Sequence, residues 1–197
     1  MRSNNEGKKY DLIADGFANM RDSFATEKKY LDLFIQYLKP HSYILDVGCG
    51  SGYPIAAYLI DQGLHVTGVD ASEKLLELAK VKCPSMKAVY GDMRTVTLDT
   101  KYDGILEWWS LFHIPKQDHE NMIFRFASWL KKDGILEFTT GDSEYEEKSS
   151  DMLNQELCFY SNASSVYEKA LKQNGFKILL CENDQETHRV WIAQYKG

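Results

Sequence analysis

Three glycines, Gly48, Gly50 and Gly52, follow the apolar run 43–47 at alternate positions and precede Pro54. Glycine reaches positive φ and lets a ligand approach the backbone where a Cβ would stand in the way. Pro54 suits the first turn of a helix, so we expect the turn to leave backbone N–H groups free for a ligand. A dinucleotide turn would carry its third glycine one residue later, and no Gly-Lys-Ser/Thr follows, so neither that turn nor a phosphate loop is predicted.

Acidic side chains stand at or near the ends of consecutive apolar runs: Asp46, Asp70, Asp92 and Glu107. Ligands of open parallel sheets bind beyond the carboxyl ends of the strands. An acid about 20 residues after a glycine turn can accept hydrogen bonds from ribose hydroxyls. Asp70 stands there, and Ser72 is better placed to cap the next helix. The pattern therefore predicts a nucleoside site at this edge of a sheet.

Histidine is the side chain whose ordinary pKa lies nearest neutrality, so it is the first candidate for a general base. His113 follows the fourth apolar run, and His188 begins the last one. Both are candidate catalytic residues, with local packing as the alternative role. His41, His65 and His119 fall at element boundaries, and we expect them to face solvent.

An aromatic cluster, Trp108, Trp109 and Phe112, lies at the end of the fourth apolar run. Such clusters are more often part of a core than of a site. Alternation along a strand would send the two tryptophans to opposite faces, so one of them is expected to line a pocket. An aromatic face there would attract a cationic group of a ligand.

Strands and helices must alternate to position these residues. The predicted strands are 43–47, 65–70, 86–90, 102–108 and 134–139, and the predicted helices between them are 54–62, 73–82 and 117–130. This alternation predicts a parallel sheet covered on both faces. Upstream, Leu31, Phe34, Ile35 and Leu38 mark an amphipathic helix that ends before Pro40. Downstream, a helix around 165–173 precedes strands 176–182 and 189–195, which the polar loop 183–186 joins as an antiparallel hairpin.

The segment 141–163 does not continue this alternation of strands and helices. Its residues 142–156 carry six acids against one lysine, with little apolar periodicity. Long irregular connections are uncommon inside compact domains and are often functional. We expect an irregular loop, either a solvated acidic loop or a lid over an active site.

Composition narrows the class of protein. The chain has 197 residues, a formal net charge of −6 and four cysteines. No two cysteines form a C-x-x-C pair, so no metal site is predicted. The negative charge disfavours a nucleic-acid partner, and no apolar run is long enough for a membrane span or a secretory signal. We expect a single cytoplasmic domain, either a monomer or a weak homodimer, with no membrane partner.

Several motifs in order, "ILDVGCGSG", "VTGVDAS", "YGDMR" and "YDGILEWWSLFHIPKQD" followed by "LKKDGILEFTTG", resemble the class I S-adenosylmethionine-dependent methyltransferases of the Rossmann-like, small-molecule type. The resemblance extends from Tyr10 to the C-terminus. It implies an α/β fold of three layers, with a seven-stranded, mostly parallel sheet whose last strand is antiparallel. It also implies one domain over 1–197, in which the helical segment 1–40 covers the cofactor and 141–163 forms the lid.

The resemblance also implies a role for each matching residue. Gly48, Cys49, Gly50 and Gly52 would pack against the methionine portion of S-adenosylmethionine, with Asp46 supporting the turn and the cofactor's amino group. Asp70 would bind the ribose, Ala71 would lie beside the adenine, and Asp92 and Met93 would bind the adenine edge. Glu107 and Trp108 would line the reacting end, and Tyr10 and Arg21 would contact the cofactor from the N-terminal segment.

The expected activity is methyl transfer to a small-molecule acceptor, with S-adenosylhomocysteine as the product. Alignment of two reactants alone can lower a barrier by about 7–11 kcal/mol, and a base helps only if the acceptor must lose a proton. The run "EWWS" lacks the Asp/Asn-Pro-Pro-aromatic motif of nucleobase-modifying members, and the acidic segment suits a neutral or cationic acceptor. A protein methyltransferase and a non-catalytic S-adenosylmethionine-binding module remain as alternatives.

Overall fold

The structure, a computed structural model, describes residues 6–184 and 188–197, without the side chains of residues 147–149. Seven strands form one sheet in the order β3-β2-β1-β4-β5-β9-β8. Their bounds are β1 Tyr43–Val47, β2 His65–Asp70, β3 Lys87–Tyr90, β4 Tyr102–Glu107, β5 Leu130–Gly141, β8 Phe176–Asn183 and β9 His188–Tyr195. β9 pairs antiparallel with both β5 and β8, whereas β1 to β5 run parallel. The predicted fold, with an antiparallel last strand, is confirmed.

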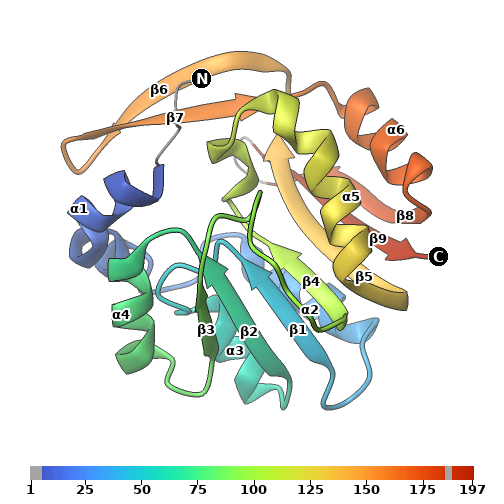
Figure 1. The fold of residues 1–197 in the computed structure, drawn as a ribbon, viewed down its shortest axis with the longest axis horizontal. Coiled ribbons are helices and arrows are strands. Elements are labelled where there is room, and N and C mark those ends of the chain that lie inside the picture. Colours follow the sequence, from blue (N-terminus) through green and yellow to red (C-terminus); the bar gives the residue numbers. More distant parts are fainter. Residues whose placement is uncertain (1–5, 185–187) are drawn as a thin grey trace.

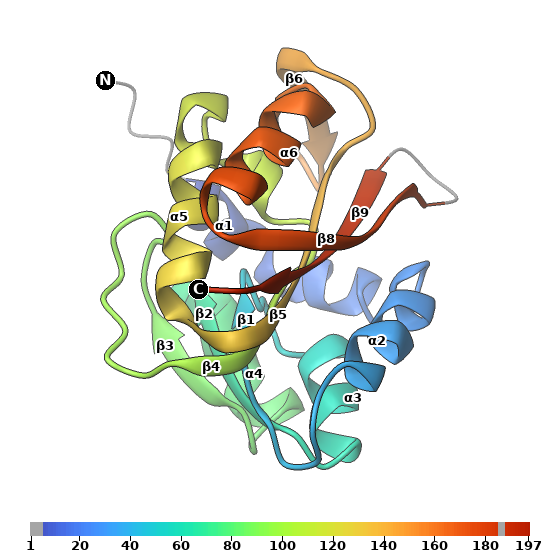
Figure 2. The same ribbon diagram turned by 90° about the vertical axis from the view of Figure 1, so that its right-hand side faces the viewer.

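Helices cover both faces of this sheet (Figures 1 and 2). Their bounds are α1 Glu6–Met20, α2 Glu27–Gln36, α3 Ile55–Asp61, α4 Glu73–Lys82, α5 His119–Trp129 and α6 Ser164–Gln173, with short 3-10 turns η1 Leu111–His113 and η2 Lys116–Asp118. One core contains Phe126 of α5 and Leu171 of α6, and the other contains Phe34 of α2 and Leu59 of α3. The central strands β1 and β4 are buried along most of their length because helices cover both faces of the sheet there.

Strand register brings the carboxyl ends of β1, β2 and β4 together. Val47 lies beside Val69 of β2 on one side and beside Glu107 of β4 on the other. The acids at or beside these positions, Asp46, Asp70 and Glu107, therefore converge at one edge of the sheet, and α1 lies near this edge beside the start of α4 (Figure 1).

The prediction of an irregular loop over 141–163 is wrong. Strands β6 Tyr145–Met152 and β7 Gln155–Ser161 form a separate two-stranded antiparallel sheet. Its turn residues Leu153 and Asn154 both have positive φ, 54° and 64°, as a tight two-residue hairpin requires. The apolar alternation is missing because only Leu157 and Ser161 of β7 are buried, so the pattern carries no period-two signal.

Smaller differences concern the ends of elements and one histidine. α3 begins at Ile55, with Pro54 as its N-cap residue rather than its first residue. The predicted loop 183–186 lies partly outside the described residues. His41 and His65 are exposed as expected, but His119 is only 1% exposed, because its ring is held between Tyr167 Oη at 2.6 Å and the Ile114 carbonyl at 3.0 Å.

Two features are absent from the described residues. No helix in that part of the chain is long and apolar enough to cross a membrane. No group of three or more His, Cys, Asp or Glu side chains within 6–184 and 188–197 could hold a metal ion.

Candidate active site

The glycine turn between β1 and α3 has the predicted backbone but not the predicted free amides. Gly48, Gly50 and Gly52 have φ of 77°, 53° and 71°, which only glycine adopts without strain. The N–H groups of Gly48 and Cys49 both donate to Val69 O, at 2.7 and 3.1 Å, and Gly52 N donates to Cys49 O at 2.9 Å. The expectation of free amides is therefore wrong for these residues, because strand β2 accepts from Gly48 and Cys49, and the turn itself accepts from Gly52.

Asp70, at the end of β2, connects this turn to the next helix. Its Oδ2 accepts from Gly50 N at 2.8 Å, and its Oδ1 accepts from Ser72 N at 2.7 Å. Ser72 Oγ caps α4 by accepting from Leu75 N at 3.1 Å, as the sequence predicts. Burial raises the pKa of Asp70, although these backbone hydrogen bonds oppose the shift. The carboxyl group is thus held rigidly between the two loops that border the cavities described below.

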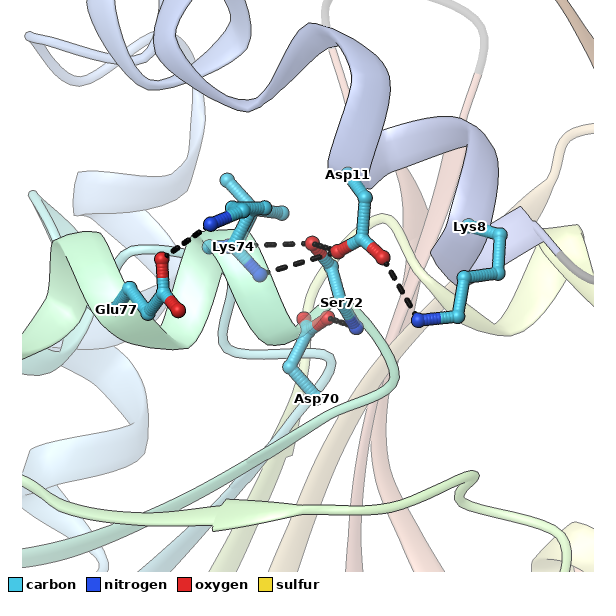
Figure 3. A network of polar contacts seen from close by, with 7 residues as sticks. Lys8, Asp11, Asp70, Ser72, Lys74 and Glu77 are labelled. Atoms are coloured by element: carbon cyan, nitrogen blue, oxygen red, sulfur yellow. Dashed lines mark hydrogen bonds and ion pairs between the residues drawn. The ribbon is translucent and has the colours of Figure 1, made fainter.

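Helix α1 is fastened to the same place by a second carboxylate (Figure 3). Asp11 accepts from Ser72 Oγ at 2.8 Å and from Lys74 N at 3.0 Å, and Lys8 Nζ lies 3.0 Å from it. A Cβ at Gly7 would clash with the backbone of Ala71. The close approach and the hydrogen bonds together set α1 directly over the loop that follows β2.

Two cavities meet beneath α1. The larger has a volume of about 280 Å³ and the smaller about 90 Å³. The two cavities share five lining residues: Tyr10, Gly48, Asp70, Ser110 and His113. Together they form one elongated site across the carboxyl ends of β1, β2 and β4, which is where ligands of such sheets bind.

Most of the predicted cofactor residues line this site. The larger cavity is bordered by Tyr10, Arg21, Asp46, Gly48, Cys49, Gly50, Gly52, Asp70 and Trp108. The smaller is bordered by Ala71, Asp92 and Met93, together with shared residues. Glu107 borders neither cavity, because its carboxylate points beneath the loop that follows β4.

The pKa values of Asp46 and Asp92 are shifted in opposite directions. Burial raises the pKa of Asp46 to about 8, with further contributions from the charges of Asp70 and Glu107. The pKa of Asp92 is lowered: partial burial opposes the shift, but the side chain and N–H of Arg94 outweigh it. Arg94 Nη2 donates to Asp92 Oδ2 at 2.6 Å and Nε to Oδ1 at 3.0 Å. At pH 7 the smaller cavity therefore presents an ionised carboxylate, and the larger one a protonated Asp46.

His113 joins three elements. Its Nδ1 lies 3.1 Å from the Cys158 carbonyl of β7, and its Nε2 lies 2.9 Å from Tyr10 Oη of α1. A carbonyl only accepts, so Nδ1 carries the proton, and Nε2 accepts from the tyrosine. Burial lowers the pKa of His113 to about 4 and raises that of Tyr10. The imidazole is thus a neutral connector between α1, η1 and β7.

His188, the other candidate base, borders neither cavity. Its ring lies 5.0 Å from that of Trp109 and 5.7 Å from that of Phe112, centroid to centroid. Its Nδ1 lies 3.4 Å from Asp184 Oδ2. His188 therefore packs against Trp109 and Phe112 and is not among the residues that line the cavities.

The two tryptophans do not follow strand alternation. β4 ends at Glu107, and Trp109 has a φ of 57°, so both rings turn to the larger cavity, with centroids 6.0 Å apart. The expectation that only one of them lines the pocket is wrong, because the chain has left the strand at this point.

Several lining residues carried no sequence signal. Met152 and Phe159 come from the hairpin β6–β7, Phe17 and Met20 from α1, and Tyr53 from the glycine turn. Their positions depend on segments packing across the strand ends, which no local pattern specifies. Arg94 was visible in the motif "YGDMR", but only its contact with Asp92 shows its role.

Comparisons with known proteins agree with this geometry. Residues 44–134 match the methyltransferase domain family. An uncharacterized methyltransferase of Alkaliphilus oremlandii is 23% identical over 160 residues, which is 74% of each chain. The chain spans 57–74% of the length of the first three curated relatives it matches.

Two solved structures illustrate the fold. The 1,6-didemethyltoxoflavin-N1-methyltransferase of Burkholderia thailandensis has a TM-score of 0.76 at 16% identity, covering 98% of this chain and 88% of its own. The [4+2]-cyclase SpnF has a TM-score of 0.74 at 17% identity, covering 100% and 97%. Residues 44–134 thus match the methyltransferase domain family, and the sheet order and converging acids of this chain resemble those of the class I S-adenosylmethionine-dependent methyltransferases.

Proposed function

We propose that the chain binds S-adenosylmethionine in the joined cavities and transfers its methyl group to a small-molecule acceptor. The observation that carries this proposal is the line of three carboxyl groups, Asp92, Asp70 and Asp46, along one elongated site. The cofactor offers an adenine amino group, ribose hydroxyls and a cationic amino-acid end, and each of these prefers a hydrogen-bond acceptor or an anion.

The backbone also fits such a ligand. A Cβ at Gly50 would project into the larger cavity, with Phe17 and Leu75 its nearest neighbours at 3.9 and 4.0 Å. Glycine therefore leaves space that any other residue would fill. Asp92 and the Met93 backbone would hold the adenine edge, Asp70 the ribose, and Asp46 the amino-acid end.

When bound, S-adenosylmethionine supplies an electrophilic methyl group on a sulfonium whose departure leaves a neutral thioether. The chain's own contribution is alignment and exclusion of water. Helix α1 and the hairpin β6–β7 border the site, and His113 ties them together through Tyr10 and Cys158. We assign His113 a positioning role, because both ring nitrogens are engaged and the neutral form persists down to a pKa of about 4.

Calorimetric titration with S-adenosylmethionine tests the binding step. Asp70→Asn should weaken binding by about 10- to 100-fold, since hydrogen bonds to charged groups contribute about 1.5–3 kcal/mol. Asp61→Asn, at an exposed position on α3 outside both cavities, should bind as the unaltered chain does. Absence of binding at millimolar cofactor would contradict the proposal.

Turnover separates the alternatives. Release of S-adenosylhomocysteine with a panel of metabolites, and not with a panel of proteins, is the expected result. Turnover on proteins alone would indicate a protein methyltransferase. Binding without turnover on either panel would favour a non-catalytic module, or another reaction on this fold such as that of the cyclase SpnF.

A further inference from the structure

The loop that follows β4 presents two indole rings to one cavity by means of an unusual backbone step. Trp109 has a φ of 57°, a left-handed conformation that a bulky residue rarely adopts. Strained residues of this kind persist only where the surroundings hold them, and they cluster at functional sites. Without this step, strand alternation would place only one of the two rings at the cavity.

Two buried side chains hold the step in place. The backbone N–H of Trp109 donates to Thr139 Oγ1 at 2.8 Å, and Thr139 is fully buried in β5. Glu107 Oε1 accepts from Ser110 N, Ser110 Oγ and Leu111 N, at 2.7, 2.7 and 2.6 Å, and its Oε2 accepts from Thr139 N at 3.0 Å. Glu107 thus acts below the loop, which explains why it borders neither cavity.

The wall that results is apolar. The indole nitrogens of Trp108 and Trp109 are both buried and have no acceptor among the described residues, so the rings present carbon faces and edges to the cavity. The same cavity is also lined by aromatic and thioether side chains: Phe17, Met20, Tyr53, Phe112, Met152 and Phe159.

Charge at this end is neutralised. Arg21 is the one cation among the described residues that line the larger cavity, and its Nη2 lies 2.6 Å from Glu27 Oε1. Its guanidinium also lies 4.8 Å from the centre of the Trp109 ring. Because Arg21 is paired with Glu27 and its guanidinium already lies over the Trp109 ring, a charged acceptor would lose hydration at this ring without gaining a partner of opposite charge. The end therefore suits an uncharged ligand.

We propose that the acceptor is a planar, uncharged aromatic or heteroaromatic small molecule that packs against the Trp108–Trp109 pair, with Thr139 and Glu107 as positioning residues for that pair. This inference rests on the proposed function. Aromatic rings prefer other rings in offset or edge-to-face arrangements over saturated carbon of similar area, so planarity as well as apolarity should govern selection.

Three ligands of one carbon skeleton test the acceptor class: 2-naphthol, its saturated counterpart decahydro-2-naphthol, and the charged 6-hydroxy-2-naphthoate. Each is titrated calorimetrically into the full chain saturated with S-adenosylhomocysteine. We expect 2-naphthol to bind at least tenfold more tightly than either counterpart. Equal binding of the three, or binding of none, would overturn the inference.

A matched pair of variants tests the positioning role. Thr139→Val removes the acceptor of the Trp109 N–H with little change in shape, and Thr139→Ser retains the hydroxyl. We expect Thr139→Val to weaken the binding of 2-naphthol about tenfold while leaving the affinity for S-adenosylhomocysteine unchanged. Thr139→Ser should keep the preference for 2-naphthol over its saturated counterpart. Equal behaviour of the two variants would contradict the role of Thr139.

Further controls keep the outcomes distinct. If Thr139→Val does not fold, Trp109→Leu should abolish the preference for 2-naphthol over its saturated counterpart, and a retained preference overturns the inference. Phe124→Leu, which alters an exposed ring of α5 outside both cavities, should leave every affinity unchanged. If the unaltered chain fails to bind S-adenosylhomocysteine, the proposed function fails; if it binds that product without the ring preference, only this inference fails.

Discussion

At the scale of single residues, Asp46 links protonation to ligand binding. It is 3% exposed, and burial together with the charges of Asp70 and Glu107 raises its pKa to about 8. The carboxyl therefore holds its proton at pH 7, whereas a cationic group beside it favours the ionised form. Binding of S-adenosylmethionine must expel that proton, so cofactor affinity should rise about tenfold per pH unit between pH 6 and 7.5.

Calorimetry in two buffers of different ionisation enthalpy measures the released proton directly. Asp46→Asn should bind with no proton release and with little dependence on pH. Asp61→Asn, exposed and distant from the site, should behave as the unaltered chain does. An affinity that stays constant from pH 6 to 7.5 in the unaltered chain would show that Asp46 is already ionised.

At the scale of elements, a few polar contacts add to the packing that positions helix α1. Asp11 fixes it to the start of α4 through Ser72 Oγ and Lys74 N, and Lys9 Nζ reaches the Glu156 carbonyl of β7 at 2.7 Å. Asp11→Ala should release α1 locally, because charge-assisted hydrogen bonds contribute about 1.5–3 kcal/mol each. Faster amide hydrogen exchange confined to α1, and faster cofactor dissociation, are the expected results.

The control is Asp15→Ala, an exposed acid of the same helix, which should leave exchange unchanged. The pKa of Asp11 is lowered: desolvation opposes the shift, but the hydrogen bonds from Lys74 N, Ser72 and Lys8 outweigh it. Its contribution is therefore complete above the ordinary pKa of about 4 and is lost as the pH falls through the lowered value. In strong acid, the unaltered chain and Asp11→Ala should therefore show the same hydrogen exchange in α1.

At the scale of the whole molecule, one buried acid weakens the fold. Glu137 of β5 is fully buried between Leu106 and Ile192, and neither carboxyl oxygen has a hydrogen-bond partner among the described residues. Burial raises its pKa well above the ordinary value. We expect Glu137→Leu to raise the free energy of unfolding by about 1–3 kcal/mol at pH 7, because an unpaired buried polar group is removed.

The sign of the pH dependence checks this assignment. The folded state keeps Glu137 protonated while the unfolded state ionises it above about pH 4.5, so the unaltered chain loses stability as the pH rises. The advantage of Glu137→Leu in denaturant unfolding should therefore grow from pH 4 to pH 7. Glu120→Gln, at an exposed position of α5, should show no such trend. If the difference in unfolding free energy between Glu137→Leu and the unaltered chain shrinks with rising pH, Glu137 has a partner in the folded protein.

Local sequence was enough for the elements of the sheet. The helix 73–82 and the strands 43–47 and 65–70 agree with their predicted bounds, because apolar runs, a serine cap and turn residues act over a few neighbours. The acids and glycines of the site were equally visible, since parallel strands bring their carboxyl ends to one edge. The hairpin β6–β7 was not, because its polar residues gave no alternation.

The sequence by itself determined the sheet, the glycine turn, and the acids at its edge, since these depend on spacing and on the geometry of parallel strands. Tertiary structure alone decided how those residues are used. Val69 O accepts from the amides of Gly48 and Cys49, both nitrogens of His113 are engaged, and Thr139 holds the backbone N–H of Trp109. These outcomes depend on contacts between segments far apart in the chain, where packing and desolvation, rather than local preference, set the energy.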